Sequence, residues 1–217
     1  MSLSLRFLAG FALAVGIGFG SAHANLLVNP GFETGDSTGW STSGDTLVLG
    51  CAGTILGCAP AGGSFLAAMN ALTQGNASFT QTVQLPGSGN YHFGAYVSFG
   101  TDGPAANFDQ GQISLTIQLP GGQSEVVGLD PNALNGQFTI PSVLGFFFTP
   151  WFLLDDFLNY AGAPVDALIN ISVQDFSPAG IVLAFDNVVI EAVPEPAALL
   201  LFGGALAGFA ARRGVRS

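Results

Sequence analysis

The sequence predicts an all-β protein with the architecture of a β-sandwich. Short runs of β-forming residues recur about every dozen residues between clusters of Gly, Pro, Asn and Asp, and several of these runs alternate between apolar and polar side chains. This pattern favours a sandwich over a helical or βαβ fold. The expected strands are residues 25–28, 46–49, 64–69, 77–85, 90–99, 111–119, 124–129, 167–175 and 181–191.

The alternation is clearest in two of these segments. In 78–85, the sequence SFTQTVQL predicts that Phe79, Gln81, Val83 and Leu85 share the inner face of a strand. In 112–119, QISLTIQL predicts the same for Ile113, Leu115, Ile117 and Leu119. The residues between them are Ser, Thr and Gln, so we expect an outer face that is polar but uncharged.

The N-terminal residues 1–24 have the pattern of a secretory signal peptide. Arg6 gives a positive start, residues 7–20 are apolar and rich in small side chains, and the tripeptide at 22–24 is Ala-His-Ala. Signal peptidase reads such a small-x-small site. We therefore expect cleavage after Ala24 and a mature chain that begins at Asn25.

The C-terminal residues 193–217 also indicate targeting rather than fold. Pro194 and Pro196 interrupt any preceding strand, 197–211 is uncharged, and Arg212, Arg213 and Arg216 follow. As a transmembrane helix, the apolar run would be about 22 Å long, short of the roughly 30 Å of bilayer hydrocarbon. We expect this segment to retain the protein in the membrane only transiently, and a single-pass tail anchor is the alternative.

This C-terminal segment resembles the PEP-CTERM sorting signal of Gram-negative bacteria. The resemblance is carried by Pro194-Glu195-Pro196, the short apolar helix and the Arg212-Arg213 cluster, in this order at the end of the sequence. It implies export, retention in the inner membrane, and processing by an exosortase near the Pro-Glu-Pro triplet. The processed protein would then reach the cell surface or be secreted.

The domain between these ends, residues 25–192, has an unusual charge. All four basic side chains, which are arginines, lie in 1–24 or 193–217, whereas 13 of the 14 acidic residues precede Val193. Phosphate recognition depends on Lys and Arg, so the composition excludes nucleic acid and anionic lipid as partners. Carboxylates without counter-charges also favour divalent cations such as Ca²⁺.

Cys51 and Cys58 are the two cysteines of the chain. In an exported protein, such a pair in a Gly-rich segment predicts a local disulfide, which would stabilise the fold by about 2 to 3 kcal/mol. A metal site would need more ligands than two thiols and one distant histidine.

The domain further resembles galactose-binding-like jelly-roll modules, a class that includes carbohydrate-binding modules. The resemblance is carried by NLLVNPGFETG at 25–35 with Gly39-Trp40, by SFTQTVQL and GNYHFGAYVS within 77–98, and by AFDNVVIE at 184–191. It implies a jelly-roll sandwich with Trp40 in the core. It also implies a structural Ca²⁺ held by Glu33, Asp186 and nearby backbone carbonyls. The alternative is that Glu33 accepts loop N–H bonds and Asp186 caps a turn.

No catalytic motif stands out in the sequence. His92 is expected to be structural, and the adjacent Asp155 and Asp156 would point apart on a strand or a helix, which does not suit a paired acid and base. The Phe-rich segment 143–160 departs from the jelly-roll pattern. It is expected to form either a lid or short helix over the sandwich or an exposed patch that contacts a glycan, a partner or a membrane. Trp151 and Tyr160 are the candidate ligand-binding residues in it.

These observations predict an exported, non-enzymatic β-sandwich protein at the cell surface or in the extracellular matrix. Its expected work, inferred from the PEP-CTERM resemblance, is association with exopolysaccharide. A structural or adhesive surface protein without sugar affinity is the main alternative, and a secreted glycoside hydrolase is the third.

Overall fold

The computed structural model describes residues 24–54, 56–57, 62–70, 75–101, 111–129, 140–141, 147–175 and 181–193. Residues 1–23 of the signal peptide, Cys58 and the sorting segment from Pro194 onward, with Glu195, Pro196, Arg212 and Arg213, lie outside the described residues. Contacts divide the chain into one unit of residues 25–192 and another of 1–24 with 193–217. Within the described ranges, no helix is long and apolar enough to cross a membrane.

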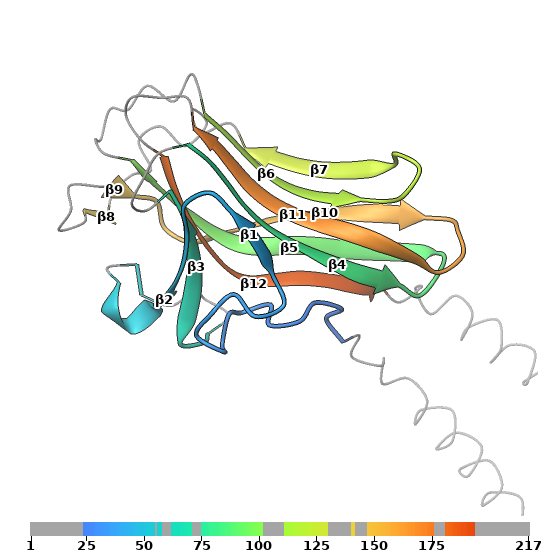
Figure 1. Cartoon of the computed structure of the whole chain (residues 1–217), viewed down its shortest axis with the longest axis horizontal. Helices are drawn as coiled ribbons and strands as arrows, with labels where there is room; N and C mark the ends of the chain where they lie inside the picture. The colour runs from blue at the N-terminus through green and yellow to red at the C-terminus, as the bar shows by residue number, and fades with distance from the viewer. Residues whose placement is uncertain are drawn as a thin grey trace, which may run out of the picture. The chain divides into compact units, whose positions relative to one another are not determined.

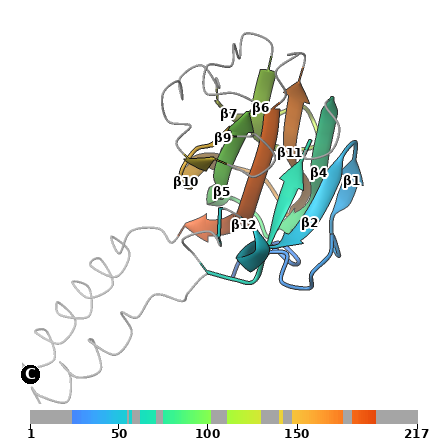
Figure 2. The same ribbon diagram turned by 90° about the vertical axis from the view of Figure 1, so that its left-hand side faces the viewer.

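The unit 25–192 is a sandwich of two β-sheets, which confirms the expected fold class (Figures 1 and 2). The first sheet has five strands in the order β1-β4-β11-β6-β7. Their bounds are β1 Ser41–Ser43, β4 Asn76–Leu85, β11 Val165–Asp175, β6 Gly111–Gln118 and β7 Ser124–Leu129. β11 is the central strand and pairs antiparallel with both β4 and β6.

The second sheet has seven strands and follows the order β2-β3-β12-β5-β9-β8, with β10 also paired to β5. Their bounds are β2 Thr46–Gly50, β3 Phe65–Met69, β12 Ile181–Val193, β5 Gly89–Thr101, β9 Phe147–Phe148, β8 Ile140–Pro141 and β10 Phe152–Tyr160. A single 3₁₀ turn, η1 at Cys51–Gly53, follows β2 in the described part of the chain.

The core lies between the inner faces of the two sheets. The expected inner positions of β4 and β6 are buried, including Phe79, Leu85 and Ile117 at 0% exposure. Phe32, Trp40, Phe79 and Phe185 form an aromatic cluster with ring centroids 5.1 to 6.4 Å apart. The cluster joins the first loop to both sheets, and Trp40 is buried in it as the sequence predicted.

The buried polar residue Gln81 fixes the N-terminal segment to this core. Its Oε1 accepts a hydrogen bond from the backbone N–H of Val28 at 2.6 Å, and its Nε2 donates to the Val28 carbonyl at 2.9 Å. The side-chain amide therefore pairs with the backbone N–H and carbonyl of Val28, as a neighbouring strand would. This pairing satisfies a polar group on an otherwise apolar inner face.

Two expectations from the sequence were wrong. Residues 25–28 are not a strand: this segment is irregular and is held by the Asn25 side chain, which donates to the Val188 carbonyl at 2.7 Å and accepts from the Ile190 N–H at 3.1 Å. The described part of the Phe-rich segment is neither a lid nor a short helix. It forms β9 and the edge strand β10, because nine residues there pair in continuous register with β5.

Candidate functional site

The outer face of the five-stranded sheet carries an ordered array of polar side chains, called the polar face below. Directly opposed residues of antiparallel strands point to the same side of a sheet, so the registers define its members. The members are Ser41 and Ser43 of β1; Asn76, Ser78, Thr80, Thr82 and Gln84 of β4; Asp166, Leu168, Asn170, Ser172 and Gln174 of β11; Ser114, Thr116 and Gln118 of β6; and Ser124 and Val126 of β7.

The array forms rows that run across the strands. One row is made entirely of serines, Ser43, Ser78, Ser172 and Ser114, on four consecutive strands. The next row holds Thr80, Asn170 and Thr116. Neighbouring strands lie about 4.8 Å apart, so hydroxyl and amide groups repeat at that interval across the sheet.

Most of these groups have no partner in the part of the chain that the structure describes. The Ser114 and Ser172 hydroxyls share a hydrogen bond of 3.0 Å, and the Thr80 hydroxyl donates to the Ser41 carbonyl at 3.3 Å. Among the described residues, the other side chains of the polar face make no hydrogen bond within the chain. Their donors and acceptors are therefore free for solvent or for a ligand.

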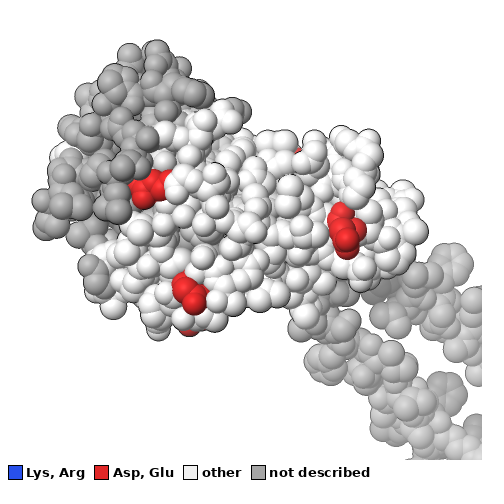
Figure 3. All heavy atoms as spheres, in the orientation of Figure 1, with Lys and Arg blue, Asp and Glu red and all other residues white. Residues whose placement is uncertain are grey.

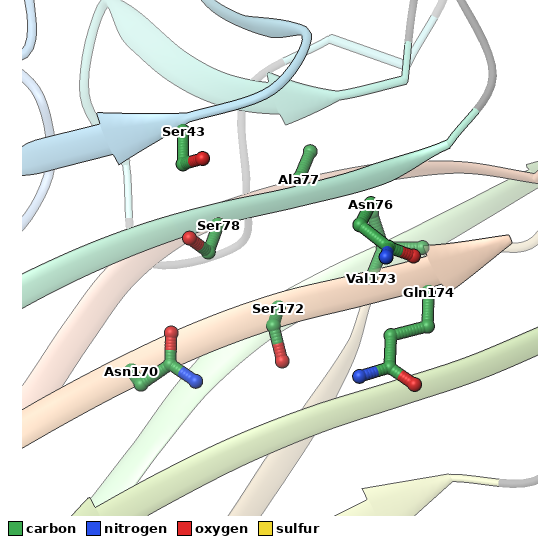
Figure 4. Close-up of a pocket in the computed structure, with 8 residues that line it drawn as sticks. All are labelled: Ser43, Asn76, Ala77, Ser78, Asn170, Ser172, Val173 and Gln174. Atoms are coloured by element: carbon green, nitrogen blue, oxygen red, sulfur yellow. The ribbon is translucent and has the colours of Figure 1, made fainter.

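Two shallow hollows lie on this face. The first has a volume of about 230 Å³ and is lined by residues of β1, β4 and β11, among them Ser43, Asn76, Asn170 and Gln174 (Figure 4). The second has about 440 Å³ and is lined by Thr82, Asp166, Leu168 and residues 118–122. β11 contributes to both hollows, so they follow one another along the central strand.

The polar face is almost free of charge. Asp166, in the second hollow, is its one charged residue, and Leu168 and Val126 are its exposed apolar residues at 38% and 51%. Figure 3 shows the molecule in the orientation of Figure 1, and in this view a few isolated carboxylates and no Lys or Arg are visible on the described surface. No aromatic ring belongs to this face. Recognition here would rest on hydrogen bonds and on apolar contacts with Leu168 and Val126.

The outer face of the second sheet differs because its polar side chains bind one another. His92 Nε2 lies 3.0 Å from Asp155 Oδ2, and His92 Nδ1 lies 3.5 Å from Glu191 Oε1. Asn159 donates to Asn90 Oδ1 at 2.9 Å. These contacts link the adjacent strands β10, β5 and β12. His92 thus contacts residues of both neighbouring strands, and its structural role stays a prediction.

The structure does not bring Trp151 and Tyr160 together. Trp151 precedes β10 and donates its indole N–H to the Leu56 carbonyl at 3.3 Å, whereas Tyr160 ends β10 and donates its hydroxyl to the Ala163 carbonyl at 2.7 Å. Nine residues along a strand separate them by roughly 30 Å. One ligand site would therefore not contain both, and each already has a partner within the fold.

Glu33 and Asp186 do lie at one place, between the first loop and β12. A methyl group added to Gly31 would lie 3.5 Å from Asp186 Oδ1 and 3.7 Å from Glu33 Cγ. Both Glu33 carboxylate oxygens accept from the Ser64 N–H, at 2.9 and 3.0 Å. Gly63 has a φ of 113°, and a side chain there would collide with Glu33 Oε1. Glycine is therefore required beside this carboxylate.

Asp186 is the exceptional group of this site. Its side chain is 0% exposed, Oδ1 accepts from the Asn187 N–H at 2.7 Å, and Oδ2 has no hydrogen-bond partner. Burial, and secondarily the negative charge of Glu33, raise the pKa of Asp186 from 3.8 to about 7. An orphaned, buried carboxylate oxygen beside a second carboxylate fits a divalent cation.

Charged side chains alone do not supply enough ligands for a metal ion between Glu33 and Asp186. The described residues contain no group of three or more His, Cys, Asp or Glu side chains that could hold a metal. A cation here would therefore need backbone or amide oxygens in addition to Glu33 and Asp186. The Gly62 carbonyl and the Asn187 side chain lie at this place and share a hydrogen bond of 3.3 Å.

Cys51 is fully buried and carries no free thiol. It begins the 3₁₀ turn and belongs to a small apolar cluster with Leu66, Ala68 and Ala184 outside the main core. Cys58 lies outside the described residues, so its pairing with Cys51 stays a prediction.

Comparison with known proteins supports the sorting signal and the fold. Residues 192–214 match the family model of the PEP-CTERM protein-sorting motif, which marks an exported protein that is processed at the membrane. The motif covers the Pro-Glu-Pro triplet, the apolar run and Arg212-Arg213, so this resemblance is confirmed. A search of curated proteins found no match.

Several solved structures are similar to the domain. They include TmCBM61 in complex with β-1,4-galactotriose, with 20% identity, a TM-score of 0.52 and coverage of 78% of this chain and 99% of that one. A family 16 carbohydrate-binding module has 19% identity, a TM-score of 0.43 and coverage of 76% and 99%. The K2 adhesin domain of Lys-gingipain has 16% identity, a TM-score of 0.47 and coverage of 81% and 100%. The likeness to TmCBM61, at 20% identity, shows the β-sandwich fold alone.

Proposed function

We propose that the protein is an exported, non-enzymatic carbohydrate-binding protein of the cell surface or extracellular matrix that associates with exopolysaccharide through the polar face. The observation that carries the proposal is the row structure of that face, where most hydroxyl and amide groups on neighbouring strands have no partner within the described chain. A polysaccharide offers both donors and acceptors at short, regular intervals, so it matches such an array. The similarity to a carbohydrate-binding module supports the fold on which the array is built.

The polar face accounts for useful affinity without a deep pocket. Each hydrogen bond contributes a net 0.5 to 1.5 kcal/mol, so several bonds along a chain are needed for useful affinity. Leu168 adds one apolar contact for the C–H side of a sugar ring. Weak binding at each site suits a protein that coats or cross-links a polymer, because many copies act on one chain.

Affinity electrophoresis tests this proposal. The exported protein should migrate more slowly through gels that contain a polysaccharide it binds than through gels without one. The variant Asn170→Ala, on the central strand, should migrate faster in the polysaccharide gel than the unmodified protein. The matched control Asn159→Ala, on the outer face of the other sheet, should not change migration. Migration of the parent protein that no polysaccharide slows, compared with gels without polysaccharide, would support the structural or adhesive alternative.

We further propose that Ca²⁺ binds between Glu33 and Asp186 and stabilises the sandwich. The ion would tie the first loop to β12 and would neutralise two carboxylates that repel one another. Its role would be structural, since no free side chain with catalytic chemistry is described beside it. The orphaned Asp186 oxygen supports this proposal.

Exosortase processing near Pro194 to Pro196 and signal-peptidase cleavage after Ala24 complete the proposed route of the protein. The match to the sorting motif supports the first step. Release from the membrane would leave the domain 25–192 at the surface or in the matrix.

A further inference from the structure

We infer that the polar face takes an extended, uncharged oligosaccharide that lies along β11 and occupies both hollows. This inference rests on the proposed carbohydrate-binding function and adds to it the charge, length and direction of the ligand.

The position of the two hollows sets the length and direction. On β11, Asn170, Ser172 and Gln174 line the first hollow, whereas Asp166 and Leu168 line the second. All five side chains lie on one face because they alternate along a strand. From Asp166 to Gln174 the strand advances roughly 26 Å. A ligand that fills both hollows is therefore an oligomer that runs along β11, and not a single sugar ring.

The chemistry of the lining side chains indicates an uncharged chain. Asn76, Asn170 and Gln174 each offer a donor and an acceptor in a side-chain amide, and serine and threonine hydroxyls do the same. Sugar hydroxyl groups need that combination. A cationic sugar would need carboxylates along its path, and Asp166 supplies one only at the end of the face.

The charge of the domain acts against anionic glycans. Residues 25–192 contain no Lys or Arg and 13 acidic side chains, and His92, on the other sheet, already contacts Asp155 and Glu191. A sulfate or carboxylate on the ligand would find no cation on the polar face. It would also meet the repulsion of the whole domain, which acts over about 10 Å at 0.1 M salt.

The test uses the exported protein and polymers that differ mainly in charge. Dextran and hydroxyethyl cellulose are the uncharged probes, and dextran sulfate and carboxymethyl cellulose are their anionic counterparts. At low salt, at least one uncharged polymer should retard the protein in affinity gels, and its anionic counterpart should not. Asn170→Ala and Gln174→Ala should each weaken retardation by about three- to tenfold, which is the loss of one hydrogen bond.

Further variants separate charge on the face from charge on the domain. Asn170→Asp, which removes the amide donor and keeps an acceptor, should weaken binding of the uncharged polymer by about three- to tenfold, and Asp156→Asn, an exposed acid of β10, should leave it unchanged. Soluble oligosaccharides should compete better as they lengthen until they span both hollows. Melting temperatures of all variants should stay close to that of the parent protein, because these side chains point to solvent.

Three results would overturn the inference alone, and a fourth would overturn the proposed function as well. Tighter binding of an anionic polymer than of its uncharged counterpart would contradict the charge argument. Equal competition by single sugars and oligomers would contradict the length argument. Uncharged binding that survives both Asn170→Ala and Gln174→Ala would place the site elsewhere and leave the carbohydrate function standing. No retardation by any polymer would instead refute the carbohydrate-binding function, and the inference with it.

Discussion

In the absence of calcium, replacement of Asp186 by Asn should destabilise the domain at acid pH and stabilise it at alkaline pH. The pKa of Asp186 is raised from 3.8 to about 7 in the folded protein. A carboxyl group with a raised pKa contributes stability that is fully present below pH 4 and is lost as pH rises through 7. Each pKa unit corresponds to about 1.4 kcal/mol, so ionisation of Asp186 costs about 4 kcal/mol by pH 8.

The size of the effect can be compared with the cost of the substitution itself. Asparagine keeps the Oδ1 acceptor for the Asn187 N–H, but its amide N–H₂ replaces an orphaned oxygen and would leave donors unpaired, at about 1 to 3 kcal/mol. At pH 8 in EDTA, the variant should therefore be more stable than the parent protein by about 1 to 3 kcal/mol. At pH 4 it should be less stable by a similar amount.

Thermal unfolding in EDTA at several pH values measures this reversal. A domain of this size shifts its melting temperature by about 2 to 4 °C per kcal/mol, so the difference between variant and parent should change by roughly 8 to 16 °C from pH 4 to pH 8. The Asp156→Asn variant, which removes an exposed carboxylate, is the control for net charge. It should show no such reversal.

Calcium gives the second half of the same prediction. If Ca²⁺ binds the folded state alone, saturation at about a hundred times Kd should stabilise the parent protein by about 2.7 kcal/mol at pH 8. Asp186→Asn should lose most of this response. If the parent and the Asn variant keep the same pH dependence, and neither responds to calcium or EDTA, Asp186 is only a hydrogen-bond acceptor and the metal proposal is wrong.

Three further predictions concern other parts of the chain. The mature protein should begin at Asn25 and end between Val193 and Pro196 in intact-mass measurements, and an uncleaved C-terminus on released protein would contradict exosortase processing. Peptide mapping without reductant should recover Cys51 linked to Cys58, whereas two free thiols in the exported protein would exclude the disulfide. Gln81→Leu should lower the free energy of unfolding by about 2 to 3 kcal/mol, because it removes two hydrogen bonds and leaves the Val28 N–H and carbonyl unpaired; an unchanged urea midpoint would show that water replaces both bonds.

The strands that alternate could be predicted from sequence, because a period of two fixes which side chains face the core. The buried inner residues of β4 and β6, with Gln81 among them, follow directly from that period. β10 lacked this signal. Its sequence FLLDDFLNY places Leu153 and Phe157 on the solvent side at 44% and 57% exposure, so an apolar run hides the alternation of an edge strand. The pairing with β5 that makes it a strand is a long-range contact.

The candidate site was predictable only in its parts. The sequence showed that the outer residues of β4 and β6 are uncharged and polar, and it selected Glu33 and Asp186 as neighbours through the jelly-roll resemblance. It could not show that β11 lies between β4 and β6, because strand order depends on contacts between distant segments. Without β11, the two polar strands do not form one continuous face. Asn170 and Gln174 therefore had no signal that assigned them to a ligand.

The contrast between the two outer faces is the main argument that the polar face has a function. Both faces carry polar side chains, and either would keep the domain soluble. On the second sheet, however, His92, Asp155, Asn90 and Asn159 satisfy one another across strands and so stabilise the sheet. On the first sheet, five strands hold amides and hydroxyls in register with few bonds between them. This domain contains no Lys or Arg, and Asp166 is the one carboxylate of the polar face. The face is therefore suited to hydrogen-bond with an uncharged polymer.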